Sequence, residues 1–285
     1  MKVAIVGAGG LVGNEFARYL SPHHDVCSLR HPDLDITDSD AVSNVILNEC
    51  PELIINCAVL GVDASEADPS LAWSVNVAGA ENLAQAANAV DAEFVQLSSN
   101  YVFDGERSRD SPYTVQDRPA PINTYGQTKL VGERAVSAAA PRCFIVRTSW
   151  VFGTGKKNFF STAPRSLRAG QKVRAITDVW ASSTYVRDLV QRVMDIVSLR
   201  HYATYHVVNS GNCSYYEFAL EVARILGNSE SELTTLIEPV KLDDLRLHAK
   251  RPVYSPMVCR VSKDVGLAPL RDWRAALAEY VGTGF

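Results

Sequence analysis

The chain begins with an apolar run that leads directly into a glycine-rich turn. Lys2–Val6 has the composition of a strand buried on both faces of a parallel sheet. Gly7-Ala8-Gly9-Gly10-Leu11-Val12-Gly13 follows, and apolar residues then recur at helical spacing. Glycines between a strand and a helix permit a tight turn, backbone contact with a phosphate and close packing. We therefore expect the helix N-terminus to bind a dinucleotide pyrophosphate through Gly7, Gly10, Leu11, Val12 and Gly13; the alternative is a purely structural turn.

Strand-like and helical patterns alternate through the first half of the chain. Further strands are predicted at 25–29, 53–58, 94–97 and 143–147, and one helix is predicted from about 69 to 89 with Leu71 facing inward. This order is typical of an α/β fold with a Rossmann-type doubly wound parallel sheet. Ligands of such sheets bind beyond the carboxyl ends of the strands, where Ala58, Ser99 and Trp150 fall.

The pattern loosens after Gly153, which predicts a smaller mixed α/β lobe toward the C-terminus. We assign residues 1–151 to the dinucleotide-binding domain, to which 178–208 and 258–285 return. Residues 152–177 and 209–257 are assigned to a substrate-binding lobe.

The second strand ends at Arg30, where a dinucleotide fold selects its cofactor. An acidic residue here suits the ribose 2′-hydroxyl of NAD, whereas a basic residue suits a 2′-phosphate. Arg30 therefore favours NADP(H), with NAD(H) as the alternative cofactor. Arg30 could instead be a solvated surface residue without a role in cofactor choice. Further contacts to the cofactor are expected from Asp35, Ile36, Cys57, Ala58 and Val59.

Ser99, Tyr125 and Lys129 form the candidate catalytic group. Ser99 follows a predicted strand, and its hydroxyl is placed to bind a substrate oxygen. Tyr125 and Lys129 are four residues apart, so on a helix they share one face. A nearby ammonium lowers the pKa of a tyrosine, which can then exchange a proton with that oxygen. An ordinary surface helix is the alternative, since this spacing is common by chance.

Composition excludes several classes of function. The apolar fraction of 47% and the charged fraction of 21% are ordinary for a globular protein. The formal net charge is −4, whereas nucleic-acid-binding proteins usually carry an excess of basic residues, so nucleic acid is not an expected partner. The absence of a membrane-length apolar run and of a signal-peptide layout favours a cytoplasmic protein. The six cysteines lack metal-ligand spacing, so we expect free thiols and no metal site, with a disulfide framework as the alternative.

Several motifs together resemble the extended short-chain dehydrogenase/reductases, and more narrowly their dTDP-4-dehydrorhamnose reductase group. The resemblance rests on the glycine-rich turn, Asn56-Cys57-Ala58, Val62-Asp63-x-x-Glu66, 98–105, Tyr125-Gly126-x-Thr128-Lys129-x-x-Gly132-Glu133, 147–153 and Lys250-Arg251-Pro252-x-x-Ser255. These motifs span nearly the whole chain.

The resemblance implies NADPH-dependent reduction of the C4 keto group of a nucleotide-linked 4-keto-6-deoxy sugar. It makes Tyr125 the proton donor, Lys129 its partner and a ligand of the nicotinamide ribose, and Ser99 the carbonyl-orienting hydroxyl. It implies that the sugar nucleotide contacts Asn100, Tyr101, Trp150, Trp180 and Arg251. Core packing is the alternative for Trp150, and a surface ion pair is the alternative for Arg251.

Two motifs of this chain differ from the usual motifs of that group, and both differences could change which sugar is accepted. The group usually has Ser-Thr-Asp where this chain has Ser98-Ser99-Asn100, so a carboxylate is missing. Its later loop usually reads Asp-Gln-x-Gly-x-Pro-Thr, whereas 178–184 lacks that Gly and Pro and carries Trp180. A reductase for another 4-keto sugar is therefore an alternative.

Other functions share this fold. An epimerase would use the same Tyr and Lys, whereas a dehydratase needs additional acid/base residues that Asn100 does not supply. A non-catalytic alternative resembles the regulatory subunit of methionine adenosyltransferase. The expected partner is a nucleotide sugar, and a homodimer is compatible with the sequence.

Overall fold

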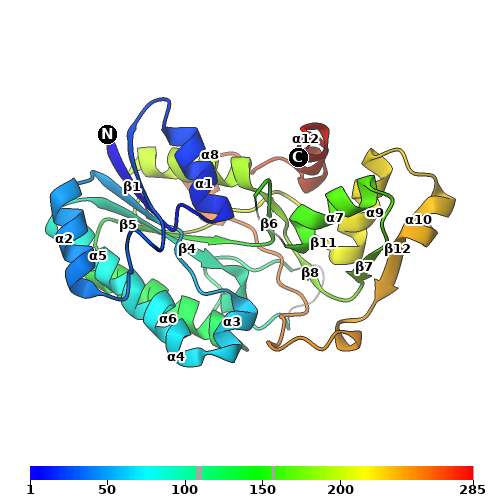
Figure 1. The fold of residues 1–285 in the computed structure, drawn as a ribbon, viewed down its shortest axis with the longest axis horizontal. Helices are drawn as coiled ribbons and strands as arrows, with labels where there is room; N and C mark the ends of the chain where they lie inside the picture. The colour runs from blue at the N-terminus through cyan, green and yellow to red at the C-terminus, as the bar shows by residue number, and fades with distance from the viewer. Residues whose placement is uncertain (107–110, 156–157, 285) are drawn as a thin grey trace.

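A parallel sheet forms the centre of the computed structural model, which describes residues 1–106, 111–155 and 158–284. Within those residues its six strands follow the order β10-β5-β4-β3-β1-β2, and every pair is parallel. The strands are β1 (Lys2–Val6), β2 (Asp25–Leu29), β3 (Leu53–Asn56), β4 (Glu93–Ser99), β5 (Cys143–Thr148) and β10 (Thr204–His206). The predicted doubly wound α/β fold is confirmed, and the sheet occupies one half of the molecule (Figure 1).

Helices cover both faces of this sheet (Figure 1). One face carries α1 (Leu11–Leu20) and α8 (Val186–Leu199), and the other carries α2 (Ser39–Glu49), α5 (Ala80–Ala89) and α6 (Thr124–Ala139). Successive strand residues point to opposite faces, so Ile5 packs in a cluster with Phe16 and Val193. Val6 packs in the other cluster, with Ile46 and Ala84. Burial on both faces explains the continuous apolar runs in the sequence.

The single helix predicted from about 69 to 89 is divided. After α3 (Val62–Ala67), the chain forms α4 (Pro69–Trp73), a π-helical segment η1 (Ser74–Gly79) and then α5. The prediction that Leu71 faces inward is wrong, because it is 44% exposed. Asn76 in η1 is buried, and its side chain bonds to both backbone polar groups of Leu60 and to the Thr128 hydroxyl. These tertiary bonds accompany the local departure from regular helix.

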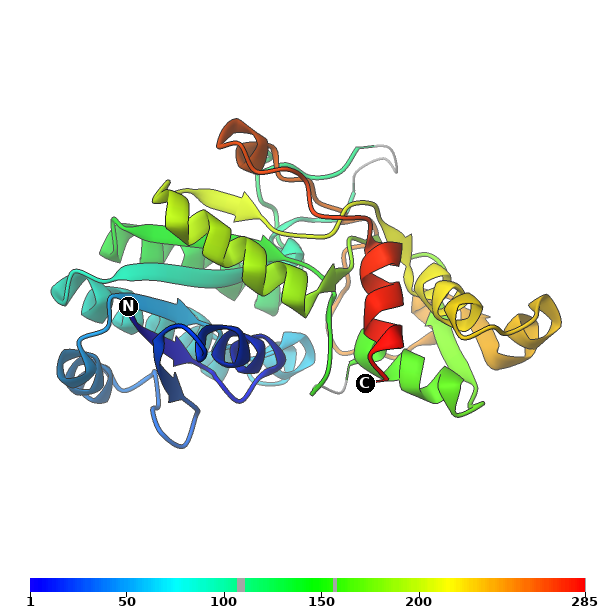
Figure 2. The same ribbon diagram turned by 90° about the horizontal axis from the view of Figure 1, so that it is seen from above.

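Several segments after β5 build a smaller mixed lobe beside the sheet (Figure 2), whereas α8 and β10 belong to the sheet half. The short strands of the lobe pair β6 (Val151–Phe152) with β9 (Thr184–Tyr185), β11 (Cys213–Ser214) with β8 (Trp180–Ala181), and β12 (Ile237–Val240) with β7 (Val173–Ile176). Its helices are α7 (Phe159–Arg168), α9 (Tyr215–Ile225) and α10 (Glu230–Leu236). Ser214 and Glu217 form a capping box that fixes the start of α9.

The last part of the chain joins the two halves. It contains α11 (Arg260–Asp264) and α12 (Trp273–Gly282). Earlier in the chain, within the described residues, two short 3-10 turns are η2 (Asn100–Val102) and η3 (Leu242–Asp244). In both ribbon views α12 lies between α8 and the lobe helices (Figures 1 and 2). Trp273 and Leu277 are buried with Phe218 of α9. The two-part assignment of the chain stays a proposal, and residues 107–110, 156–157 and 285 of those ranges lie outside the described residues.

Candidate active site

A cavity of about 250 Å³ opens at the carboxyl ends of β1, β3, β4 and β5. In the sheet, β2 lies on one side of β1, and β3, the next strand along the chain, lies on the other side. The direction in which strands are added therefore reverses at β1, and the cavity lies at this topological switch point. Most residues predicted for the site line this cavity: Gly10, Leu11, Val12, Gly13, Cys57, Ala58, Val59, Ser99, Asn100, Tyr101, Tyr125, Lys129 and Trp150.

The glycine-rich turn is packed too closely for side chains. Gly7 has a φ of +77°, and a Cβ there would lie 2.6 Å from the backbone nitrogen of Ala58. A Cβ on Gly13 would lie 2.4 Å from the carbonyl oxygen of Gly7. Helix α1 follows Gly10, and no side chain caps its N-terminus. The uncapped helix end beside this tight turn fits a dinucleotide pyrophosphate.

Tyr125 and Lys129 stand on α6 and both line the cavity. The helix begins at Thr124 because the Asn123 side chain caps it, accepting a hydrogen bond from the Gly126 amide at 2.7 Å. Lys129 is only 3% exposed. The Tyr125 ring meets the Tyr101 ring nearly edge-on, with centroids 5.5 Å apart. The helix therefore places both predicted side chains where the sequence spacing required.

The pKa values in this site follow burial more than charge. Burial raises the pKa of Tyr125, and its hydrogen bond with Ser99 acts in the opposite direction. Burial also lowers the pKa of Lys129 to about 8. The Lys129 Nζ donates to the carbonyl oxygen of Leu97 at 2.7 Å. The expectation that the ammonium lowers the tyrosine pKa is wrong: desolvation of the phenol raises it, and the one group that acts against burial is Ser99, not Lys129.

Ser99 ends β4 and is held by its neighbours. Its hydroxyl accepts from the Tyr101 amide and donates to the side-chain oxygen of Asn100, each at 3.2 Å. The Asn100 amide nitrogen donates to the hydroxyl of Ser255 at 2.7 Å. Asn100 and Ser255 are both buried. The asparagine that departs from the usual carboxylate therefore ties Ser99 to a distant segment of the chain.

A buried ion pair anchors α6 to the sheet. Glu133 lies one turn beyond Lys129 and forms a bidentate pair with Arg147 of β5, at 2.9 and 2.6 Å. Ser98 of β4 donates to the same carboxylate. The pair links α6 to two strands. Burial lowers the pKa of Lys129, and the negative charge of Glu133 acts in the opposite direction. Glu133 thereby favours the ammonium form of that lysine.

Gly7, Arg30, Asp35 and Ile36 lie outside the cavity lining. Gly7 lies directly beneath the lining, against Ala58. Arg30 is exposed beside the glycine-rich turn, and its Cγ lies 3.9 Å from where a Cβ on Gly9 would stand. The Asp35 carboxylate accepts bonds from the Thr37 amide and hydroxyl, and Ile36 packs in the core. Their roles toward a cofactor stay predictions.

Trp180 and Arg251 also lie outside the lining. The Arg251 guanidinium pairs with both carboxylate oxygens of Asp63 at 2.7 Å and lies 5.9 Å from the centre of the Tyr101 ring. The backbone of Trp180 bonds to Val253 and Ser255, the segment that holds Asn100. The structure thus connects both residues to the site through neighbouring contacts.

Trp150 both lines the cavity, as a residue that contacts the sugar nucleotide would, and packs against other aromatic rings, as a core residue would. It lines the cavity, and it also packs against Phe160 and Tyr215, with ring centroids 4.5 and 4.3 Å away. Its φ of +44° is left-handed, which is uncommon for a bulky residue and turns the chain sharply after β5.

Sequence reasoning missed several lining residues: Val62, Leu97, Ser98, Thr148, Ser149, Val151 and Asn158. Thr148 and Ser149 carried a usable signal, because they follow an apolar strand run just as Ser99 does. Asn158 and Val62 lie on other elements, and their approach to the site depends on tertiary packing.

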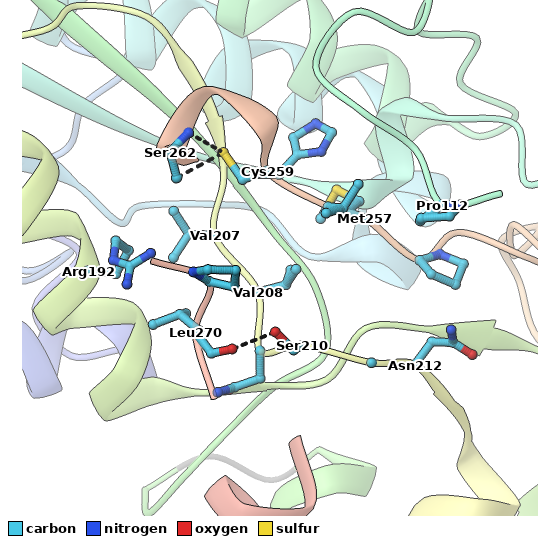
Figure 3. A pocket seen from close by; sticks show the side chains of 16 residues that line it. Pro112, Arg192, Val207, Val208, Ser210, Asn212, Met257, Cys259, Ser262 and Leu270 are labelled. Carbon is cyan, nitrogen blue, oxygen red and sulfur yellow. Dashed lines mark hydrogen bonds between the residues drawn. The ribbon is translucent and has the colours of Figure 1, made fainter. Parts of the chain in front are cut away.

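A second cavity, of about 320 Å³, lies near the end of β10 (Figure 3). The predicted site residues, all within the described ranges, do not line it. Its two serine hydroxyls have partners: Ser210 donates to the Leu270 carbonyl oxygen and Ser262 donates to the Cys259 sulfur (Figure 3). The hydroxyls of this cavity therefore need no ligand to be satisfied.

The remaining sequence expectations concern metals, thiols and membranes. Within the part of the chain that the structure describes, His, Cys, Asp and Glu side chains form no group of three or more able to hold a metal ion. All six cysteines are free, and Cys50 is exposed. No helix in the described ranges combines the length and apolarity needed to cross a membrane.

Comparisons with known proteins cover nearly the whole chain. The family model described as "RmlD substrate binding domain" matches residues 1–284. The dTDP-4-dehydrorhamnose reductase of Mycolicibacterium smegmatis is 38% identical over 98% of this chain and 85% of its own length. A solved dTDP-4-dehydrorhamnose reductase from Clostridium acetobutylicum is 35% identical, with a TM-score of 0.92 over 99% of both chains. The Bacillus anthracis dTDP-4-dehydrorhamnose reductase, solved in complex with NADP, is 33% identical, with the same TM-score and coverage.

Proposed function

We propose a reductase function from one premise: the chain belongs to the RmlD substrate binding domain family. This membership confirms the resemblance drawn from the motifs. The chain is an NAD(P)-dependent oxidoreductase that reduces a keto group of a dTDP-linked sugar with NADPH. The narrower reaction is reduction at C4 of a 4-keto-6-deoxy sugar, dTDP-4-dehydrorhamnose or a relative.

The observation that carries this proposal is the joint placement of Ser99, Tyr125 and Lys129. All three line one cavity, which continues to the uncapped N-terminus of α1. NADPH, when bound, supplies the hydride for the carbonyl carbon. Tyr125 remains protonated at neutral pH because burial raises its pKa, so its phenol can give a proton to the carbonyl oxygen.

Ser99 and Lys129 support that proton transfer. The Ser99 hydroxyl has one proton, which it gives to Asn100 in the structure. This proton is proposed to turn to the carbonyl oxygen, which it orients, and then to the phenolate left on Tyr125, since the bond with Ser99 lowers the tyrosine pKa. Lys129 is held by the Leu97 carbonyl, and below a pH of about 8 it presents an ammonium in a buried site. A buried positive charge favours the developing negative charge on the reacting oxygens.

The sugar nucleotide is proposed to occupy the side of the cavity that faces the lobe. Asn100, Tyr101 and Trp150 line the cavity, and Trp150 contacts Phe160 and Tyr215 of the lobe. Asn100 offers a neutral amide fixed by Ser255 where the related group usually has a carboxylate, which is a reason to test more than one 4-keto sugar. Arg251 and Trp180 are proposed to act on this side through Tyr101 and Ser255.

Replacing Arg30 by Ala is expected to weaken NADPH binding about tenfold while leaving NADH binding nearly unchanged. The reason is loss of a charge-assisted contact with the 2′-phosphate, typically worth about 1.5–3 kcal/mol. Titration of nicotinamide fluorescence against both cofactors measures the two affinities. Arg18→Ala, which removes an exposed arginine of α1, serves as the control. Equal weakening of NADPH and NADH by Arg30→Ala would assign it no role in reading the phosphate.

The test of the proposed function is an assay of NADPH absorbance with dTDP-4-dehydrorhamnose and with other dTDP-linked 4-keto sugars. Oxidation of NADPH that depends on the sugar supports reduction. An epimerase would change the sugar without net loss of NADPH. A non-catalytic subunit would bind NADPH and leave every sugar unchanged.

Location in the cytoplasm and assembly as a homodimer are also proposals. The sequence pattern supports the proposed location, and the sequence is compatible with a homodimer. Sedimentation of the purified protein measures the assembly, and fractionation of cells that express it measures the location.

A further inference from the structure

The first turn of α6, which carries Tyr125, is held by groups from two other parts of the chain. Glu66 of α3 accepts two hydrogen bonds from Thr124, one from the amide at 2.9 Å and one from the hydroxyl at 2.8 Å. The Asn123 side chain donates to the carbonyl oxygen of Lys250 at 2.7 Å. Asn123 and Thr124 immediately precede Tyr125, so both contacts hold the chain directly before the proposed proton donor.

A third contact joins the two holding segments to each other. Arg251 follows Lys250 and pairs with both carboxylate oxygens of Asp63 at 2.7 Å. Asp63 stands on α3, three positions before Glu66. Helix α3, the segment at 250–251 and the start of α6 are thus linked by a closed set of three contacts, which we call the α6 clasp: Asp63–Arg251, Lys250–Asn123 and Glu66–Thr124. Each of the three segments is held by the other two.

Glu66 is the member of the clasp that binds a free backbone donor of α6. The first amides of a helix have no partner within the helix. The Asn123 side chain satisfies the Gly126 amide, and Glu66 satisfies the Thr124 amide. A carboxylate is favoured at this positive end of the helix dipole, and its hydrogen bonds are charge-assisted. Because its two oxygens bind two atoms of one residue, Glu66 fixes the direction of the turn as well as its distance from α3.

The position of this turn matters for proton transfer. A phenol that donates a proton must lie within hydrogen-bond reach of the reacting oxygen. A displacement of about 1 Å can lower a rate about 10²-fold. Tyr125 is the second residue of α6, and helix ends are the parts of a helix that open most easily. The place of the phenol therefore depends on the groups that hold the first turn.

We propose that Glu66 is a positioning residue for Tyr125: by holding Thr124 it keeps the first turn of α6, and with it the phenol, within reach of the sugar carbonyl. This inference rests on the proposed function, because it takes Tyr125 as the proton donor. It gives a role to the acidic residue that ends the Val62-Asp63-x-x-Glu66 motif. The competing assignment is a contact that stabilises the fold and leaves the chemistry unaffected.

The test uses Glu66→Gln, with Glu232→Gln as the matched control. Glutamine keeps the size of the side chain but has one acceptor oxygen instead of two, so at least one bond from Thr124 is lost. Glu232 makes the same pair of bonds at the start of α10, to the amide and the hydroxyl of Ser229 at 2.7 and 2.8 Å, and does not line the active-site cavity. Thr124→Val and Thr124→Ser vary the other partner, since only the serine retains the hydroxyl.

Glu66→Gln is expected to lower kcat about tenfold while the KM for the sugar and the affinity for NADP⁺ stay nearly unchanged. The solvent deuterium isotope effect on kcat is expected to rise, because a displaced phenol makes proton transfer the slower step. Thr124→Val should show the same pattern more weakly. Thr124→Ser and Glu232→Gln should match the unmodified protein. Assay of NADPH absorbance in H₂O and D₂O measures these quantities, and a thermal scan measures stability.

An unchanged kcat in Glu66→Gln would overturn the inference. A fall in kcat without a change in the solvent isotope effect would also overturn it, because fewer folded molecules lower the rate without slowing proton transfer. If Glu66→Gln does not fold, Thr124→Val decides by the same two measurements. A lack of sugar-dependent NADPH oxidation by the unmodified protein would instead overturn the proposed function, and the role of Glu66 with it.

Discussion

Replacing Tyr125 by Phe is expected to lower turnover about 10³-fold while leaving NADP⁺ binding nearly unchanged. The variant loses only the phenolic hydroxyl, which in the proposed mechanism protonates the carbonyl oxygen. The ring that meets Tyr101 edge-on is retained, so the cavity wall should keep its shape. Steady-state assay and fluorescence titration of the cofactor measure the two quantities.

Tyr205→Phe is the matched control for this variant. Tyr205 is fully buried on β10, outside the active-site cavity, and its hydroxyl bonds to the carbonyl oxygen of His201. Its loss should affect stability rather than turnover. Retention of more than about a tenth of the activity by Tyr125→Phe would remove the tyrosine from the role of proton donor.

Replacing Lys129 by Met is expected to lower kcat/KM about 10²-fold at neutral pH, because no buried ammonium then stabilises the negative charge that develops on the carbonyl oxygen. The fold should survive the change. The carbonyl oxygen of Leu97 accepts a hydrogen bond from Lys129 and another, at 3.0 Å, from the side-chain nitrogen of Gln96. It therefore keeps a partner when Lys129 is replaced. Removing a buried charge also relieves a desolvation cost. Activity near that of the unmodified protein would contradict the electrostatic role.

The pH dependence of kcat/KM distinguishes an effect of the charge on Lys129 from an effect of its side-chain shape. Burial lowers the pKa of Lys129 to about 8, so the free enzyme loses the ammonium as the pH rises through that value. We expect kcat/KM of the unmodified protein to fall above pH 8, and Lys129→Met to lack this limb. Persistence of the limb in Lys129→Met would assign it to another group.

The same pKa shift predicts the sign of the effect on stability. In the unfolded chain a lysine keeps a pKa of about 10.4, so between the two values the unfolded state binds more protons. Stability from this group therefore rises with pH from about 8 upward, and charged Lys129 costs stability at lower pH. Lys129→Met should show its largest gain in melting temperature below pH 8.

Local spacing was sufficient to predict the glycine-rich turn and the helix that carries Tyr125 and Lys129. Gly7 and Gly13 sit where a side chain would collide with backbone, and this constraint is visible in the order strand, glycines, helix. Tyr125 and Lys129 share a face because α6 begins at Thr124, and Asn123 immediately before it is a strong N-cap residue. Both features depend on neighbours in the sequence.

Features that depend on distant partners were not predictable in the same way. The helix predicted from about 69 to 89 is interrupted where Asn76 bonds to Leu60 and Thr128. Arg251 pairs with Asp63, 188 positions away, and spacing gives no signal for that partner. The raised pKa of Tyr125 likewise reflects desolvation, which arises only when the chain is packed.

Hydride transfer to the sugar can be followed with NADPH deuterated at both C4 positions of the nicotinamide and dTDP-4-dehydrorhamnose as substrate. Mass spectrometry and NMR of the sugar product follow the label. We expect one deuterium per product, located at C4 of the sugar, with one NADPH oxidised for each sugar reduced. A product that carries no deuterium, or a sugar that changes configuration while NADPH is conserved, would contradict hydride transfer to that carbon.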